Sequence, residues 1–303
     1  MELLQLHHLN KTENKQNMKV PFYLFLAITL HSFAQVKVIN GEIKDIENKA
    51  ALHYANIGIA NKNTGTVSNS EGKFSLKMDE SVNENDVVTF SYVGYQSKTV
   101  AVSQLTLPNN IIELTPLKNQ LDEVVVKFVK PKPKVLGRNS KGLGLMHTNF
   151  YTYYEKDVDD RLSKEVGMKF TLKKDCKIND LNFNITSNEF SSLKFRLNFY
   201  KIENGLPSNR IVEKDIVFEI KDEFKGWFKV DLKPYEIYLD KETADVAVTI
   251  QWVESKKANE KSKYFGISTA KSITETSFYR EKAMDSWSKS GQSMSFYLNA
   301  MCR

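Results

Sequence analysis

Side chains that could hold a catalytic zinc ion are scarce in this chain. A catalytic zinc takes three protein ligands and keeps a fourth position open for water or substrate. Beyond the first 34 residues the chain has two histidines, His53 and His147. Tyr-Ala-Asn follows the first and Thr-Asn-Phe follows the second, so neither begins a His-x-x-Glu ligand pair. We therefore expect no metal and no cofactor, and we predict that both histidines lie at the surface or make hydrogen bonds in a core.

Nucleophilic chemistry has equally little support. The nearest match to a nucleophile elbow is GISTA at residues 266–270, which follows two strand-like residues. It lacks the second glycine of that motif and no helical pattern follows it, so Ser268 is predicted to be an ordinary strand residue. Cys176 has no general base in its sequence neighbourhood that would activate a thiol. The chain is predicted not to be an enzyme.

One short segment is rich in carboxylates. Asp157, Asp159 and Asp160 fall within the tetrapeptide DVDD. Oxygen ligands of this type suit calcium, but the glycine and the distal glutamate of a calcium-binding loop are missing. We predict that this acidic turn faces solvent.

Tryptophan is the residue type best suited to binding here, because its flat ring can stack on a sugar or anchor a partner protein. Trp252 continues an apolar face formed by residues 246, 248 and 250 and is predicted to be buried. Trp227 precedes a strand whose inward face begins at Phe228. Trp287 lies in the polar segment DSWSKSGQS and is our choice for a possible ligand platform.

Two cysteines, Cys176 and Cys302, are present. In an oxidising compartment they could form a disulfide. Two cysteines so far apart in sequence are equally often a pair of buried thiols, because sequence fixes no distance between them. The disulfide between Cys176 and Cys302 is therefore one of two open alternatives.

The composition is that of a globular protein, with 41% hydrophobic and 26% charged residues. A length of 303 residues suits two domains of ordinary size. The formal net charge of +6 arises from 43 basic and 37 acidic residues that are interspersed along the chain. Because there is no basic stripe, we predict no nucleic-acid partner.

The N-terminal segment predicts export. Lys19 precedes an apolar run over residues 20–30, and Ser32 and Ala34 stand at the −3 and −1 positions of a cleavage site. The apolar run is well short of the roughly 20 residues that a membrane-spanning helix needs.

We therefore predict an N-terminal extension and signal peptide over residues 1–34, with cleavage after Ala34. Residues 1–17 are polar and lie upstream of a suitable start at Met18, so we expect translation to begin there. The protein is predicted to be exported and to be periplasmic or associated with the outer membrane.

After residue 35, apolar residues alternate with polar ones nearly everywhere, which is the pattern of half-buried strands. In the first part, Gly, Asn, Asp and Ser clusters such as NKNTG separate short strands, which indicates an antiparallel β-sandwich over residues 35–129. The second part, residues 145–303, predicts a two-sheet, jelly-roll-like sandwich. Its alternating segments are residues 166–172, 181–185, 193–199, 216–220, 228–232, 246–252 and 294–298. The predicted fold class is all-β.

The two parts are separated by a segment rich in proline and lysine. Prolines in KPKPK, residues 130–134, remove backbone donors and bias their neighbours to extended conformations. We predict a polyproline-like linker over residues 130–144.

Four segments of the first part carry a family resemblance: NGEIKD (40–45), YANIGIANKNTGTVSNSEGKFSL (54–76), FSYVGYQ (90–96) and ELTPLKNQLDEVVV (113–126). This stretch resembles the carboxypeptidase-regulatory-like domain of exported and outer-membrane proteins of Bacteroidetes-type bacteria. The resemblance implies a transthyretin-like Greek-key β-sandwich with a structural or interaction role, and it transfers no catalytic residue. The last segment is similar to the one that leads into the plug of TonB-dependent receptors, but we expect neither plug nor barrel here.

The second part has a more diffuse resemblance. FYKIENGLP (199–207), GWFKVDL (226–232) and residues 246–252 look like jelly-roll domains of secreted proteins, some of which bind carbohydrate.

Two functions follow from these observations. The first is a non-catalytic cell-envelope protein that acts as a structural or protein-interaction module, with an envelope or outer-membrane protein as partner. The alternative is a carbohydrate-binding protein whose C-terminal sandwich holds a glycan. An exposed aromatic pair beside carboxylates or amides, on one sheet face or loop rim, would favour the alternative.

Overall fold

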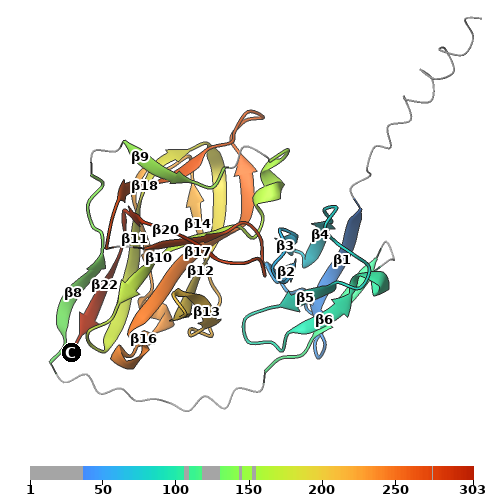
Figure 1. Ribbon diagram of the computed structural model, residues 1–303, viewed down its shortest axis with the longest axis horizontal. Coiled ribbons are helices and arrows are strands. Elements are labelled where there is room, and N and C mark those ends of the chain that lie inside the picture. Colours follow the sequence, from blue (N-terminus) through green and yellow to red (C-terminus); the bar gives the residue numbers. More distant parts are fainter. Residues whose placement is uncertain (1–36, 106–108, 118–129, 143–144, 152–154, 275) are drawn as a thin grey trace, which may run out of the picture. The chain divides into compact units, whose positions relative to one another are not determined.

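The computed structural model describes residues 37–105, 109–117, 130–142, 145–151, 155–274 and 276–303 (Figure 1). The predicted signal peptide and its cleavage site after Ala34 lie outside these residues. Within them the secondary structure consists of strands and four short 3-10 helices: η1 (Val102–Gln104), η2 (Val158–Arg161), η3 (Lys233–Tyr235) and η4 (Lys241–Thr243). The all-β prediction is confirmed. No helix in the described ranges has the length and apolar character needed to cross a membrane.

The N-terminal sandwich consists of two small sheets. One has the order β4 (Lys73–Lys77), β1 (Val38–Asp45), β7 (Asn110–Leu114). The other has the order β3 (Gly65–Val67), β2 (Asn56–Ile59), β5 (Val87–Ser91), β6 (Lys98–Ala101). Their apolar faces form one buried cluster that includes Ile43, Ile57, Leu76, Val88 and Phe90.

One pair of strands departs from the predicted antiparallel arrangement of this sandwich. β1 and β7 run parallel, with Ile43 opposite Ile112. A parallel pair needs a crossover connection instead of a tight hairpin, and the long segment from β1 to β7 contains the other strands of the sandwich. Turn spacing indicates hairpins between neighbouring strands but does not say which distant strands pair.

The C-terminal sandwich is built from two larger sheets, which we call the β12 sheet and the β11 sheet (Figure 1). The β12 sheet has the order β13 (Leu206–Arg210), β12 (Phe190–Glu203), β17 (Asp245–Lys257), β10 (Glu165–Thr171), β19 (Ser277–Arg280), β20 (Ser288–Ser290), and β14 (Ile216–Lys221) also pairs with β12. The β11 sheet has the order β21 (Gln292–Met294), β18 (Phe265–Lys271), β11 (Cys176–Asn188), β22 (Phe296–Cys302), β8 (Lys132–Gly137). β15 (Gly226–Asp231) and β16 (Ile237–Leu239) also pair with β11, and β9 (Met146–Asn149) pairs with β18.

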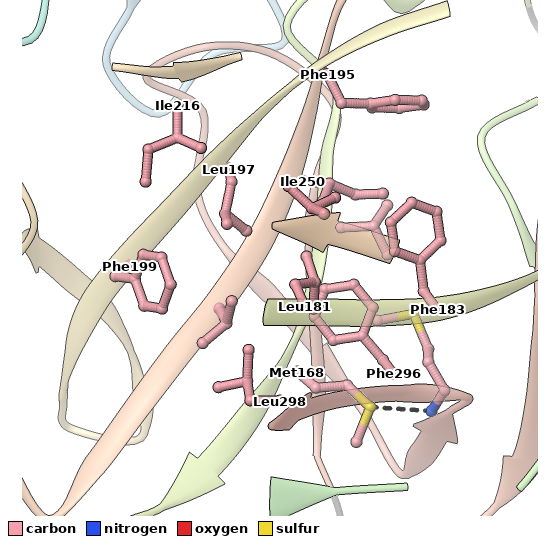
Figure 2. Close-up of a cluster of buried hydrophobic side chains, with 14 of the residues drawn as sticks. Met168, Leu181, Phe183, Phe195, Leu197, Phe199, Ile216, Ile250, Phe296 and Leu298 are labelled. Atoms are coloured by element: carbon pink, nitrogen blue, oxygen red, sulfur yellow. Dashed lines mark hydrogen bonds between the residues drawn. The ribbon is translucent and has the colours of Figure 1, made fainter. Parts of the chain in front are cut away.

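The core of this sandwich lies between the two sheets (Figure 2). From the β11 sheet it receives Leu181, Phe183, Phe296 and Leu298, all fully buried. From the β12 sheet it receives Met168, Phe195, Leu197, Phe199 and Ile250. These are the inward residues that the period of two predicts, so each sheet keeps its other face for polar side chains.

The linker prediction is wrong over residues 132–137. These residues form β8, which runs antiparallel to β22, with Pro133 opposite Met301. β8 is the last strand in the order of the β11 sheet. Proline is tolerated there because an edge strand leaves one row of backbone groups without a strand partner.

A disulfide joins Cys176 to Cys302. The two residues face each other in the β11–β22 register, with their Cα atoms 4.1 Å apart. The structure therefore contains the bridge that the sequence left as one of two alternatives. It closes a loop that spans most of the C-terminal sandwich, because the cysteines are 126 residues apart.

A satisfied ionic network lies on the β12 sheet. The Glu165 carboxylate is fully buried and accepts hydrogen bonds from Arg280 Nη2 at 2.6 Å, Asn198 Nδ2 at 2.7 Å and Tyr200 Oη at 3.4 Å, and also from Thr249 Oγ1. Burial raises the pKa of Glu165, but Arg280 and these hydrogen bonds outweigh it, so the pKa lies below the ordinary value. The carboxylate is charged at neutral pH.

Removing the disulfide should destabilise the protein. We expect the Cys176→Ala/Cys302→Ala variant to lose about 2–5 kcal/mol of unfolding free energy, because the unfolded chain is no longer cross-linked. Urea unfolding followed by tryptophan fluorescence measures this loss. The wild type in dithiothreitol should approach the variant, and equal stability with and without the reductant would contradict the prediction.

Glu165→Gln should cost about 3–5 kcal/mol at pH 7, because it leaves the buried Arg280 without a counter-charge. Since the folded-state pKa of Glu165 is lowered, its contribution is complete above the unfolded glutamate pKa of roughly 4.3 and is lost as pH falls through the folded value. Urea unfolding from pH 7 to pH 3 should therefore show the variant's deficit shrinking as pH falls. A deficit independent of pH would show that the ionised carboxylate does not supply the stability.

Candidate functional site

The outward face of β11 carries a row of hydrogen-bonding side chains. The β11–β22 register shifts between Ile178 and Asp180. Past that shift Leu181 and Phe183 point into the core. Asp180, Asn182 and Asn184, which alternate with them along the strand, therefore point outward. We call Asp180, Asn182 and Asn184 of β11, together with Asn299 of β22, the amide strip. The three β11 members are each only 5–6% exposed, so they form a floor between larger neighbours.

Asp180 organises one end of this floor. Its Oδ1 accepts hydrogen bonds from Asn182 Nδ2 and from Asn299 Nδ2, the latter at 2.7 Å. Lys229 Nζ lies 3.4 Å from its other oxygen, and the lysine side chain is 58% exposed. These contacts fix the orientation of both amides and leave one oxygen of each asparagine side chain available as an acceptor.

Asn184 is different. It is 6% exposed, yet its side-chain amide has no hydrogen-bond partner among the residues that the structure describes. Its backbone N–H donates to Ser295 O at 3.0 Å, so the main chain is satisfied while the side chain is not. Its amide nitrogen and oxygen are not among the enclosed side-chain atoms that lack a partner, so they reach solvent and can be hydrated. Such a group is an obvious point of contact for a ligand's hydroxyl groups.

Two aromatic rings stand beside the unpaired amide. Trp227 lies opposite Asn184 in the β11–β15 register, and Tyr297 lies opposite Asn182 in the β11–β22 register. Residues directly opposite each other in an antiparallel pair share a face. The two ring centroids are 5.2 Å apart with an angle of 68° between the planes, and Trp227 is 36% exposed. The pair therefore borders the amide strip and offers ring surface to solvent.

A third aromatic residue marks the other end of β11. Tyr238 of β16 is 40% exposed and lies opposite Lys177. The ammonium of Lys177 is 5.2 Å from the Tyr238 ring centroid and 3.3 Å from Glu236, and contacts with these two side chains raise the pKa of Lys177. From Asn184 to Lys177 the face extends about 20 Å at about 3.3 Å per residue. The charges along it are paired, so the face is polar without a strong net charge.

Trp287, the platform chosen from sequence, is located elsewhere. Its ring lies 4.5 Å from the guanidinium of Arg280 and packs edge-to-face on Tyr200 at 5.6 Å, beside the Glu165 network of the β12 sheet. The structure does not bring Trp287 together with the amide strip. Much of its ring surface covers a buried ion pair, so a structural role accounts for it, and its choice as a ligand platform stays an untested prediction.

The remaining sequence candidates have ordinary structural roles. Ser268 is a buried residue of β18 whose hydroxyl donates to Lys141 O at 2.8 Å, as predicted for a strand residue. The acidic turn caps η2, with Asp157 accepting from Asp159 N at 3.4 Å. Trp252 is fully buried, as predicted. In the described ranges no three His, Cys, Asp or Glu side chains are grouped so that they could hold a metal ion.

The sequence contained part of the signal for the amide strip. Residues 180–184 read Asp-x-Asn-x-Asn, with Leu181 and Phe183 at the x positions. This alternation gives the outward face of β11 short carboxylate and amide side chains, where exposed strand faces often carry lysine and glutamate. The same parity places Trp227 on the face opposite Phe228. No sequence pattern, however, reports that Trp227 and Tyr297 meet across β11.

Comparison with known proteins identifies the N-terminal part. Residues 39–126 match the CarboxypepD_reg-like domain family, so the resemblance drawn from sequence is confirmed. TonB-dependent receptor P3 of Formosa agariphila is 27% identical over 113 residues, which is 37% of this chain and 11% of the receptor. The chain thus spans about a tenth of the length of that curated relative.

Two solved structures match this chain with low structural similarity. The cysteine protease and lectin-like domains of Cwp84, a surface layer associated protein of Clostridium difficile, give a TM-score of 0.38 at 10% identity, covering 83% of this chain and 59% of that one. BcpA, the major pilin subunit of Bacillus cereus, gives a TM-score of 0.17 at 10% identity, covering 85% and 68%. Both scores are too low to carry an argument about fold or function.

The unpaired amide generates a stability prediction. Replacing Asn184 with Val should change the free energy of unfolding by less than about 0.5 kcal/mol, because the amide reaches solvent and makes no hydrogen bond to the described residues. The matched change Asn182→Val should lower it by about 1 kcal/mol, because it removes a bonded amide. Urea unfolding compares the two variants. A destabilised Asn184→Val would contradict the view that this amide lacks a structural role.

Proposed function

We propose that this chain, whose residues 39–126 are a CarboxypepD_reg-like domain, is a non-catalytic binding protein of the cell envelope that holds carbohydrate on the amide strip of its C-terminal sandwich. The observation that carries the proposal is the contact between the exposed Trp227 ring and the partly exposed Tyr297 ring, next to the Asn184 amide, which makes no hydrogen bond to the described residues.

Sugars present two kinds of surface, and this face matches both. The C–H face of a pyranose ring is apolar and packs on an aromatic ring, as Trp227 and Tyr297 allow. Ring hydroxyl groups both donate and accept hydrogen bonds, and an asparagine amide does the same. Because Asp180 already fixes Asn182 and Asn299, those amides are oriented before a ligand arrives, which reduces the entropy cost of binding.

The shape of the site favours an extended ligand. Small molecules are usually held in concave pockets that bury most of their surface. The outer face of β11 from Lys177 to Asn184, which contains the amide strip, is instead about 20 Å long at about 3.3 Å per residue and has aromatic residues at both ends. A segment of polysaccharide can lie along such a face and contact Trp227 at one end and Tyr238 at the other.

Placement in the envelope is supported by two observations. The N-terminal domain is of the CarboxypepD_reg-like family, and the receptor of Formosa agariphila that it resembles is by name a TonB-dependent receptor. The sequence of residues 1–34 also has the features of a secretory signal. An exported protein with a glycan-binding face would meet its ligand outside the cytoplasm.

A glycan screen with matched tryptophan variants tests the proposal. The protein carrying residues 35–303 is applied to immobilised algal, plant and bacterial polysaccharides, and affinity for any hit is measured by titration calorimetry. Trp227→Ala and Asn184→Val should each weaken binding by about tenfold or more, which is about 1.4 kcal/mol. The wild type should bind at least one polysaccharide.

Trp287→Ala is the control, because it also removes one indole but on the β12 sheet. Its binding should equal that of the wild type once circular dichroism has verified its fold. Loss of binding in Trp287→Ala with full binding in Trp227→Ala would move the site to Trp287. If the folded wild type binds no polysaccharide, the carbohydrate function is wrong.

A protein-interaction role for the N-terminal domain is the second candidate. It is favoured by the CarboxypepD_reg-like match over residues 39–126 and by the similarity of the chain, over 113 residues, to a TonB-dependent receptor. Deleting residues 38–117 should release the protein from the envelope fraction of the source bacterium. A soluble, disulfide-bonded remainder confirms that the C-terminal sandwich has folded, and unchanged fractionation would count against this role.

A further inference from the structure

A second feature of the C-terminal sandwich lies away from Trp227, where the β8 edge meets β10 and the turn that follows β10. A pocket of about 450 Å³ opens there. It is lined by residues of β8, of β10 with its following turn, and by Thr274 and the two cysteines of the disulfide. We call it the lysine pocket, after Lys134, Lys169, Lys173 and Lys174.

The lining of the lysine pocket has one sign of charge. Four lysines contribute to it and no aspartate or glutamate does. Lys169 lies 3.3 Å from Asp245, whereas Lys134, Lys173 and Lys174 have no acidic partner among the described residues. Like charges gathered around a recess attract a counter-ion, because the field is focused there.

The nearby acid does not neutralise these lysines. Asp175 follows Lys174 directly, but its carboxylate accepts from Lys241 N at 3.1 Å and lies 3.5 Å from Arg303 Nε. These contacts lower the pKa of Asp175, so it is charged and engaged on its own side of the turn. The charges of Lys134, Lys173 and Lys174 are therefore left for a ligand.

The floor of the pocket is apolar. It includes Leu136, Phe170 and the Cys176–Cys302 bridge. β8 passes close over β10 at Gly137, where a Cβ atom would lie 2.5 Å from the Phe170 ring and where φ is +86°. Only glycine meets both conditions easily, so this residue permits the close approach of β8 to Phe170.

We propose that the lysine pocket binds an anionic head group carried on an apolar body. The lysine ammonium groups would make charge-assisted hydrogen bonds to phosphate, sulfate or carboxylate oxygens. The apolar body would cover Leu136, Phe170 and the disulfide. A pocket of this volume accommodates one such molecule, within the ordinary range for small-ligand sites. The inference does not depend on carbohydrate binding at the amide strip.

Dodecyl phosphate below its micelle concentration is the probe, titrated into the full exported chain by calorimetry. It should bind at least tenfold more tightly than inorganic phosphate, which lacks the apolar body, and than dodecyl maltoside, which lacks the charge. Lys173→Glu/Lys174→Glu should weaken its binding at least tenfold, and 0.5 M NaCl should weaken wild-type binding because salt screens exposed charges. Equal affinity for inorganic phosphate, or no binding of dodecyl phosphate, would overturn the proposal.

Lys261→Glu/Lys263→Glu is the charge-matched control. These exposed lysines precede β18, which pairs with the Asn188 end of β11, whereas the pocket lies at the Cys176 end. The control should bind dodecyl phosphate as the wild type does, and equal weakening in both double variants would assign the effect to net charge. Vesicles of phosphatidylglycerol and of phosphatidylcholine separate the ligand's sources. Sedimentation with anionic vesicles that survives Lys173→Glu/Lys174→Glu would overturn the pocket in favour of general surface attraction.

Discussion

Burial of one apolar face of the β11 sheet against one apolar face of the β12 sheet is the constraint on which the C-terminal sandwich depends. β11 is central to it, because it pairs with β22, β15, β16 and β18. Because successive side chains of a strand point to opposite faces, the neighbours of Leu181 and Phe183 must point to the outer face once these two residues point into the core. The amide strip is thus a consequence of core packing, and the register shift at residues 178–180 decides which residues compose it.

The two sheets treat their buried polar groups differently. On the β12 sheet, Glu165 is enclosed and fully bonded, and Trp287 covers its partner Arg280. That arrangement stabilises the fold and has no capacity left for a ligand. On the β11 sheet, the Asn184 amide reaches solvent and makes no hydrogen bond to the described residues, beside the rings of Trp227 and Tyr297. A polar group that reaches solvent keeps its donors and acceptors available for a ligand.

The β8 edge links the remaining features of the sandwich. Proline and lysine in β8 discourage the pairing of a further strand, which protects an edge from association. The same strand, held against β22 beside the disulfide, carries Lys134 to the lysine pocket. Positions that discourage aggregation thereby also concentrate positive charge at one place. The amide strip and the lysine pocket occupy different parts of one sandwich and suit ligands of different chemistry.

The period of two in the sequence was sufficient to predict an all-β fold, the inward residues of most strands and the buried Trp252, because alternation is a local property of a strand. Short-range motifs were sufficient for the CarboxypepD_reg-like domain. Strand pairing is not local, and so the parallel β1–β7 pair, the incorporation of residues 132–137 into a sheet, and the Cys176–Cys302 bridge emerge only from the tertiary structure. For the same reason, the polar sequence around Trp287 suggested a ligand platform there, whereas the strand register brings Trp227 and Tyr297 together across β11. A binding surface made of side chains from three strands is defined by their register, and register is set by the core that all three strands share.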